Sequence, residues 1–140
     1  MGSAITKQYL DELTYRVIGC AIEVHKQLGP GLLESIYEKC FIHELNLRGI
    51  SCVSQVSAPI KYKGLSIDTE LRLDVLVEDI LCVELKAQQG LLPIHEAITL
   101  SYMEMLHKPK GLLINFQCVN IVKEGQRTLV NNYFSHLPDK

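Results

Sequence analysis

Two carboxylates and a lysine lie close together where two apolar segments follow one another in the chain. The segment Leu71–Lys86 reads LRLDVLVEDILCVELK. Strand side chains alternate between faces, so burying the apolar positions leaves Asp74, Glu84 and Lys86 on one common face. These apolar positions are Leu71, Leu73, Val75 and Val77, followed by Leu81, Val83 and Leu85. Such carboxylates suit a hard cation, Mg²⁺ or Mn²⁺, beside which a lysine can orient water or balance phosphoryl charge.

The turn between these strands must have a particular length for the carboxylates to share a face. Residues directly opposite in an antiparallel pair project to the same face. A two-residue loop at Glu78–Asp79 would pair Asp74 with Val83 and turn Glu84 away. A three-residue connection, pairing Asp74 with Glu84 or with Cys82, keeps the carboxylates together, and so does a β-bulge. The spacing therefore predicts one of these two solutions.

Periodicity and turn residues predict the elements that position this hairpin. Apolar residues at helical spacing indicate three helices, and Gly29-Pro30-Gly31 ends the first of them. Pro59 limits one strand to a sheet edge or a bulge, and a wholly apolar run predicts a strand buried on both faces. In chain order the predicted helices cover about Thr6–Leu28, Leu32–Arg48 and Pro93–His107, and the strands beside the hairpin cover Ser51–Lys63 and Leu112–Phe116.

The C-terminal part is expected to contain one more hairpin and a terminal segment that frays. Val119–Val122 and Gln126–Val130 are predicted to pair around Lys123–Gly125. The tail Asn131–Lys140 is interpreted as a fraying surface segment. The last apolar strand and its partner offer an edge that could pair between chains, so a homodimer is a further expectation.

Length and composition limit the class of protein. With 140 residues we expect one domain, and no apolar run approaches the length of a membrane span, so no membrane partner is expected. Met1–Ala4 is interpreted as an expression remnant or an ordinary start without a signal region, and the protein as cytoplasmic. The five cysteines lack a CxxC pair, which favours buried free thiols. A net charge of −2 does not indicate nucleic-acid binding, which would need a local basic patch.

The segment Gly31–Tyr37 reads GLLESIY and resembles the motif that names the GxxExxY proteins. The later segments LRLDVLVED, CVELKA, PIHEA and GLLINF fall in the same order as in that family. The family is similar in turn to the PD-(D/E)XK nuclease superfamily. The resemblance extends from about Tyr15 to Val130 and implies an α/β fold with an αβββαβ restriction-endonuclease-like core, in which helices flank a mixed central sheet. We expect one nuclease-like domain over residues 1–140, with its core at about 15–130.

The resemblance also implies roles for individual residues. Asp74, Glu84 and the Leu85 carbonyl would hold the metal, Mg²⁺ or Mn²⁺. Glu34 would hold it directly or through water, and Lys86 would position the attacking hydroxide. Each has a structural alternative: Asp74 and Glu84 on a solvated sheet face, Lys86 as their ion-pair partner, and Glu34 as an acid favoured in a first helical turn.

Two functions of different classes are therefore open. The first, which we prefer, is a magnesium-dependent nuclease, a hydrolase that cleaves phosphodiester bonds in DNA or RNA. The second is a catalytically idle nuclease-like fold that binds nucleic acid or protein. The complete set of four charged residues favours the first. The low net basicity favours the second, and so does Ile98, which occupies a position where the family often carries a glutamine.

Several other polar residues have plainer interpretations. Tyr37 is expected to pack in the core with a satisfied hydroxyl. His95 is expected on the surface, although it could support the site. Gln88 and Gln89 follow Lys86 and would bond either a phosphate or solvent. Basic pairs could hold phosphates if the fold brings two of them to one rim, but dispersed lysines more often only solvate the surface. These pairs are Lys61 with Lys63, Lys108 with Lys110, and Lys123 with Arg127.

Overall fold

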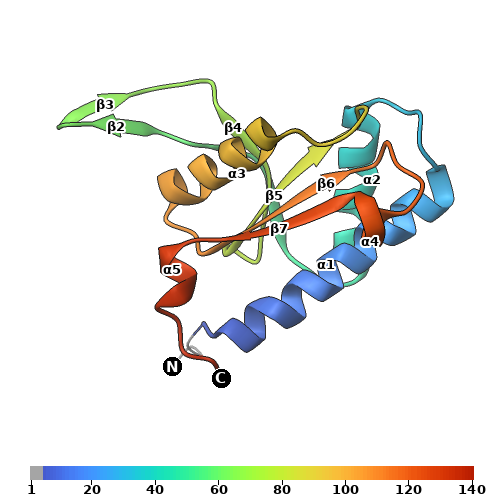
Figure 1. Cartoon of the computed structure of the whole chain (residues 1–140), viewed down its shortest axis with the longest axis horizontal. Coiled ribbons are helices and arrows are strands. Elements are labelled where there is room, and N and C mark those ends of the chain that lie inside the picture. The colour runs from blue at the N-terminus through green and yellow to red at the C-terminus, as the bar shows by residue number, and fades with distance from the viewer. Residues whose placement is uncertain (1–4) are drawn as a thin grey trace.

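A five-stranded mixed sheet carries the charged hairpin at its centre (Figure 1). This computed structural model describes residues 5–140, and the interpretation of Met1–Ala4 lies outside the described residues. In spatial order the strands are β1 (Cys52–Ser57), β4 (Arg72–Val77), β5 (Leu81–Lys86), β6 (Lys110–Asn115) and β7 (Gln126–Val130). β5 and β6 run parallel, and the other neighbouring pairs are antiparallel. The hairpin formed by β4 and β5 is therefore covered on both sides by further strands.

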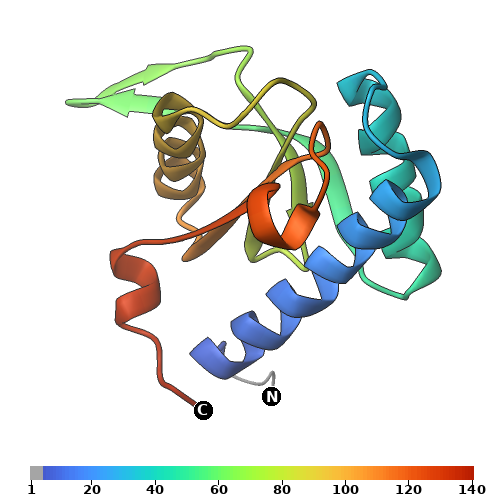
Figure 2. The same cartoon turned by 45° about the vertical axis from the view of Figure 1, so that its right-hand side comes forward.

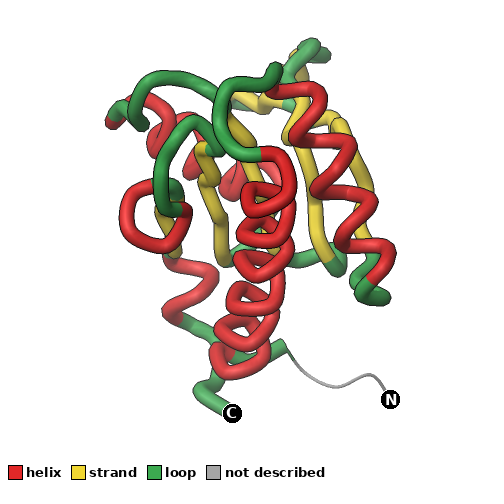
Figure 3. The backbone as a smooth tube through the Cα atoms, turned by 90° about the vertical axis from the view of Figure 1, so that its right-hand side faces the viewer, coloured by secondary structure: helices red, strands yellow, loops and turns green. Residues whose placement is uncertain are grey.

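Helices pack on both faces of this sheet, as Figures 2 and 3 show. Helices α1 (Lys7–Leu28) and α2 (Glu34–Leu47) share one apolar cluster with the sheet, and α3 (Pro93–Leu106) shares another on the opposite face. The expected αβββαβ order is present as α2-β1-β4-β5-α3-β6. The predicted mixed sheet flanked by helices is thus confirmed. Within residues 5–140, no helix is both long and apolar enough to span a membrane.

The three predicted helices have local reasons to begin and end where they do. The Thr6 hydroxyl accepts a 3.0 Å hydrogen bond from the Tyr9 N–H and caps α1. Gly29 adopts a φ of 68° after the last residue of α1, a conformation that glycine enters without steric cost. Pro93 begins α3, where its missing N–H is not needed. These helices contact β1, β5 and β6.

The turn between β4 and β5 has the predicted length. Val77 pairs with Leu81, so three residues, Glu78 to Ile80, make the connection. Glu78 and Asp79 both have positive φ values, 50° and 56°. The prediction of a three-residue connection is confirmed, and the same register continued would place Asp74 opposite Glu84.

One part of the alternation was predicted wrongly. Leu73 and Val75 were expected on one face, but Leu73 packs on the α3 side and Val75 packs on the side of α1 and α2. The regular ladder is broken at the residue between them, because the Asp74 N–H donates to the Glu84 carboxylate instead of to a backbone carbonyl. Such local irregularity in a strand redirects side chains. Leu71, expected to be buried, is 40% exposed.

The strand expected over residues 51–63 is divided in two. β1 ends at Ser57, and Pro59, which has no N–H to donate, separates it from β2 (Ile60–Tyr62). β2 pairs with β3 (Leu65–Ile67) in a separate two-stranded sheet. This β2–β3 arm extends away from the body of the molecule (Figure 1).

The hairpin expected over residues 119–130 is not formed. Residues Ile121–Glu124 make the short helix α4, capped by an Asn120 side chain that accepts the Lys123 N–H at 2.9 Å. β7 pairs with β6 instead and forms one edge of the sheet.

The tail, expected to fray, is tied to the start of α1. Residues 132–135 form the short helix α5 (Asn132–Ser135). Beyond it, the Pro138 carbonyl accepts the Lys7 N–H at 2.9 Å, and the Asp139 carbonyl accepts the Gln8 N–H at 3.0 Å. These bonds satisfy two of the N–H groups that the first turn of a helix leaves free.

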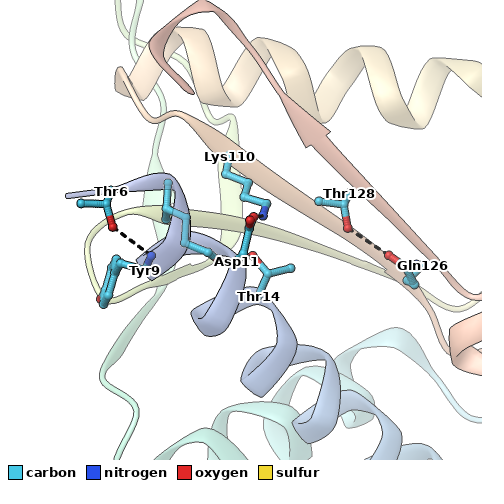
Figure 4. A network of polar contacts seen from close by, with 8 residues as sticks. Thr6, Tyr9, Asp11, Thr14, Lys110, Gln126 and Thr128 are labelled. Carbon is cyan, nitrogen blue, oxygen red and sulfur yellow. Dashed lines mark hydrogen bonds and ion pairs between the residues drawn. The ribbon is translucent and has the colours of Figure 1, made fainter. Parts of the chain in front are cut away.

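Lys110 is buried rather than available to a phosphate. Its side chain donates to Asp11 at 2.7 Å, and the residue is 4% exposed (Figure 4). Its ammonium group also lies 5.5 Å from the centre of the Phe134 ring. The interpretation of Lys110 as one of a pair of surface cations was therefore wrong, because the tail and α1 cover it.

Candidate active site

The charged residues expected from the sequence gather at one end of the sheet. Asp74 lies near the start of β4, and Glu84 and Lys86 lie at the end of β5. The connection at residues 78–80 is at the opposite end of this hairpin. Glu34 is the first residue of α2, whose N-terminus approaches the same end. The electrostatic influence of Lys86 and Asp74 on the pKa of Glu34 shows that the three groups are neighbours.

Asp74 and Glu84 lie side by side where β4 and β5 separate. Glu84 Oε1 accepts the Asp74 N–H at 2.9 Å, and Asp74 Oδ2 accepts the Leu85 N–H at 2.8 Å. Glu84 is 5% exposed, and Asp74 is half-buried. The two carboxylates thus act as acceptors for backbone N–H groups at the point where the regular pairing of β4 with β5 stops.

Burial and mutual repulsion make this pair costly to ionise. Burial, and after it the neighbouring Asp74 carboxylate, raise the pKa of Glu84 to about 8. Burial also raises the pKa of Asp74, while the Leu85 N–H and the Lys86 ammonium oppose this shift. For Glu34, too, burial raises the pKa and Lys86 opposes it. Lys86 is the nearby cation, but within residues 5–140 it forms no ion pair.

Two residues that sequence reasoning missed complete the cluster. The Gln55 side-chain amide donates to both oxygens of Glu38 at 3.1 Å and approaches Asp74 Oδ1 at 3.4 Å. Glu38 follows Glu34 by four residues, which places both acids on the same face of α2. That spacing was a usable signal for Glu38. The sequence held no comparable signal for Gln55.

The loop that precedes α2 is held by Tyr37. The Tyr37 hydroxyl donates to the Gly29 carbonyl at 2.5 Å and accepts the Leu32 N–H at 3.2 Å. Its ring stacks on Phe116 with 4.5 Å between ring centres. The expectation of a packed tyrosine with a satisfied hydroxyl is confirmed. Because Phe116 follows β6, this contact fixes the N-terminus of α2 against the sheet.

The loop that follows Lys86 is held by Asn115 and His95. Asn115 is 2% exposed and exchanges two hydrogen bonds with the Gln88 backbone, at 2.9 and 3.2 Å. His95 Nδ1 accepts the Leu92 N–H at 2.9 Å, and its Nε2 lies 3.2 Å from the Gln88 side-chain amide. The surface interpretation of His95 was wrong, because the first turn of α3 places the ring under this loop, where it is 9% exposed.

On α3, Tyr102 packs beside the carboxylates and Ile98 does not. Tyr102 is 7% exposed; burial raises the pKa of its hydroxyl, and the charges of Glu84 and Asp74 raise that pKa further. Ile98 is 39% exposed. The position that the resemblance associates with glutamine therefore supplies no polar contact here.

The donor chemistry of the cluster fits a hard divalent cation. Within residues 5–140, no three His, Cys, Asp or Glu side chains are already arranged to hold a metal ion. Asp74 and Glu84 each accept a backbone N–H with one oxygen; the second oxygen of Asp74 meets only the longer 3.4 Å contact from the Gln55 amide. All donors are carboxylate oxygens, the ligands that Mg²⁺ prefers.

The comparisons with known proteins agree with this arrangement. A family model described as the PD-(D/E)XK nuclease superfamily matches residues 11–128. No curated protein and no solved structure was found to match. The matched residues include α2, β1, the β4–β5 hairpin and α3, which together carry the whole cluster. The chain belongs to the PD-(D/E)XK nuclease superfamily.

Proposed function

We propose that this protein is a divalent-metal-dependent nuclease that hydrolyses phosphodiester bonds in DNA or RNA. One observation carries the proposal: the Asp74 and Glu84 carboxylates lie side by side where β4 and β5 separate, and Lys86 follows Glu84 by two residues, in a member of a nuclease superfamily. The GLLESIY segment at Gly31–Tyr37 supports placing the chain among the GxxExxY proteins within that superfamily.

Each charged residue would have a distinct task. Asp74, Glu84 and the Leu85 carbonyl would bind Mg²⁺ or Mn²⁺, with Glu34 binding it directly or through water. The bound cation would stabilise the negative charge that develops on the phosphoryl oxygens. Lys86 would orient the attacking water and promote loss of its proton. The buried, crowded carboxylates favour this assignment because a cation would relieve their repulsion.

Cleavage assays with the purified chain test the enzyme hypothesis. We expect cleavage of at least one of single-stranded DNA, duplex DNA, single-stranded RNA and duplex RNA with Mg²⁺ or Mn²⁺, and none with a chelator. Lys86→Ala, purified in the same way, should lose about a hundredfold in rate, which excludes a contaminating nuclease. If no substrate is cut and calorimetry detects no metal binding, the enzyme hypothesis fails and the idle binding module replaces it.

The β2–β3 arm supports nucleic acid as the partner. It leaves the sheet between β1 and β4, at the end of β4 that carries Asp74. Lys61 and Lys63 are exposed on the arm, Tyr62 between them is 60% exposed, and the Lys63 ammonium lies 5.4 Å from the Tyr62 ring centre. Lysines contact phosphates and an exposed aromatic ring stacks on bases, so the arm would hold a strand that enters the site.

Removing both arm lysines should weaken binding to all sequences alike. For Lys61→Ala/Lys63→Ala, we expect the slope of log affinity against log salt concentration to fall by about 2, because each lysine accounts for about one phosphate contact. Fluorescence anisotropy with labelled DNA and RNA at several salt concentrations measures the slope. The matched variant Lys26→Ala/Lys123→Ala removes the same charge from α1 and α4. An equal loss in both variants would show that overall charge, and not the arm, supports binding.

Three further assignments belong to the proposal. We propose a single nuclease-like domain with its core at about residues 15–130. A cytoplasmic location is supported by the five cysteines, all of which are free thiols, as in a reducing compartment. A homodimer is supported by β7, which forms an edge of the sheet and leaves Val130 48% exposed.

A further inference from the structure

We propose that Gln55 is a positioning residue that orients the Asp74 carboxylate and joins α2 to the sheet at the acidic cluster. The inference rests on the proposed function only for its consequence, which is metal affinity. The contacts that support it belong to the chain itself. Gln55 lies in β1, and neither the motif of the family nor the charged hairpin includes it.

The backbone of Gln55 is unusual for a residue within a strand. Its φ is 54°, in the left-handed region that residues with a side chain rarely adopt. On either side the pairing of β1 with β4 is regular: Ser54 pairs with Val75, and Val56 pairs with Leu73. The Gln55–Asp74 pair between them is absent from the ladder. Such conformations persist where the surrounding structure enforces them, often at functional sites.

The side chain of Gln55 connects two acids from different elements. One amide nitrogen donates to Glu38 on α2 at 3.1 Å and approaches Asp74 on β4 at 3.4 Å. It is an uncharged donor placed between two like charges. Burial raises the pKa of Glu38 and of Asp74, and the Gln55 hydrogen bond opposes both shifts. The amide thus lets the helix that bears Glu34 approach the strand that bears Asp74.

The Asp74 carboxylate is held by both neighbouring strands. Leu85 on β5 donates to Oδ2 at 2.8 Å, and Gln55 on β1 approaches Oδ1 at 3.4 Å. These two contacts fix the plane of the carboxylate. Partners of this kind, which orient a ligand without touching the metal, commonly change metal affinity by about 10- to 100-fold when they are removed.

Two substitutions separate the backbone of Gln55 from its amide. Gln55→Gly accepts the positive φ at no steric cost and removes the side chain. Gln55→Asn also tolerates this conformation and keeps a shorter amide, so it should restore part of the function. Asp79→Gly is the matched control, because Asp79 has a φ of 56° and is exposed in the turn at the opposite end of the hairpin.

The first measurement needs no metal. Hydrogen exchange followed by NMR in chelator compares the Leu85 N–H, which donates to Asp74, with the Val83 N–H on the same strand. In Gln55→Gly we expect exchange of the Leu85 N–H to become about tenfold faster relative to Val83, because its acceptor is no longer held. Gln55→Asn should be intermediate, and Asp79→Gly should match the wild type. Unchanged exchange in Gln55→Gly would overturn the inference.

The second measurement is the affinity for Mn²⁺ by calorimetry. We expect Gln55→Gly to bind about tenfold more weakly than the wild type, with Gln55→Asn between them. Equal affinities in the wild type and Gln55→Gly would also overturn the inference. A wild type that binds no Mn²⁺, together with the predicted change in exchange, would instead refute the proposed function and leave the positioning of Asp74 by Gln55 supported.

Discussion

Replacing Asp74 by Asn is expected to lower the rate of metal-dependent cleavage by about a thousandfold or more. The two side chains have the same shape, and the Asn oxygen can still accept the Leu85 N–H that Asp74 Oδ2 accepts at 2.8 Å. The variant should therefore fold. It lacks the negative charge that would bind the cation, and a bound cation supplies several kcal/mol of charge stabilisation in such reactions.

Initial rates of cleavage at a fixed Mg²⁺ concentration measure this effect, and thermal unfolding in chelator establishes that the variant is folded. Asp79→Asn is the matched control, because the Asp79 side chain is 89% exposed in the turn and lies at the far end of the hairpin. Its rate should equal that of the wild type. If Asp74→Asn cleaved at the wild-type rate, Asp74 would not be a metal ligand.

Replacing Glu84 by Gln is expected to stabilise the metal-free protein at pH 8 while abolishing cleavage. The pKa of Glu84 is raised from 4.5 to about 8 in the folded state, so the folded protein binds this proton more tightly than the unfolded chain does. The contribution of the protonated group to stability is complete below pH 4.5 and is lost as the pH rises to about 8. Gln stays neutral throughout, so we expect a gain of up to about 4 kcal/mol at pH 8.

Urea unfolding in chelator between pH 5 and pH 9 measures this gain. The stability of the wild type should fall relative to Glu84→Gln as the pH rises, and saturating Mn²⁺ should stabilise the wild type alone, because only a state that binds the ion gains from it. Glu104→Gln, an exposed substitution on α3, should follow the wild-type curve. If the free energy of unfolding changed with pH in the same way in the wild type and in Glu84→Gln, ionisation of Glu84 would not destabilise the folded protein.

The part of the site that lies on the hairpin could be predicted because strand side chains alternate with a period of two. That period linked the burial of Val83 and Leu85 to the position of Glu84, and it required the three-residue connection that the Val77–Leu81 pair establishes. The helices were predictable for a similar reason: apolar spacing indicated them, and Gly29 and Pro93 marked their ends.

What could not be predicted depends on contacts between distant segments. The change of face between Leu73 and Val75 arises because the Asp74 N–H donates to a side chain ten residues away. His95 is buried because a loop folds over it, and Lys110 is buried because the tail returns to α1. Gln55 belongs to the same class, since its contacts join three elements and no local pattern of residues indicates them.

Diffraction from crystals grown with Mn²⁺, using its anomalous signal, tests the central claim most directly. The proposed function predicts one Mn²⁺ ion bound by a carboxylate oxygen of Asp74 and one of Glu84, and its loss in Asp74→Asn. The opposite result would be a crystal at saturating Mn²⁺ in which the ion is absent or lies elsewhere. Asp74 and Glu84 would then keep their hydrogen bonds to the Leu85 and Asp74 N–H groups, and the proposed function would be contradicted.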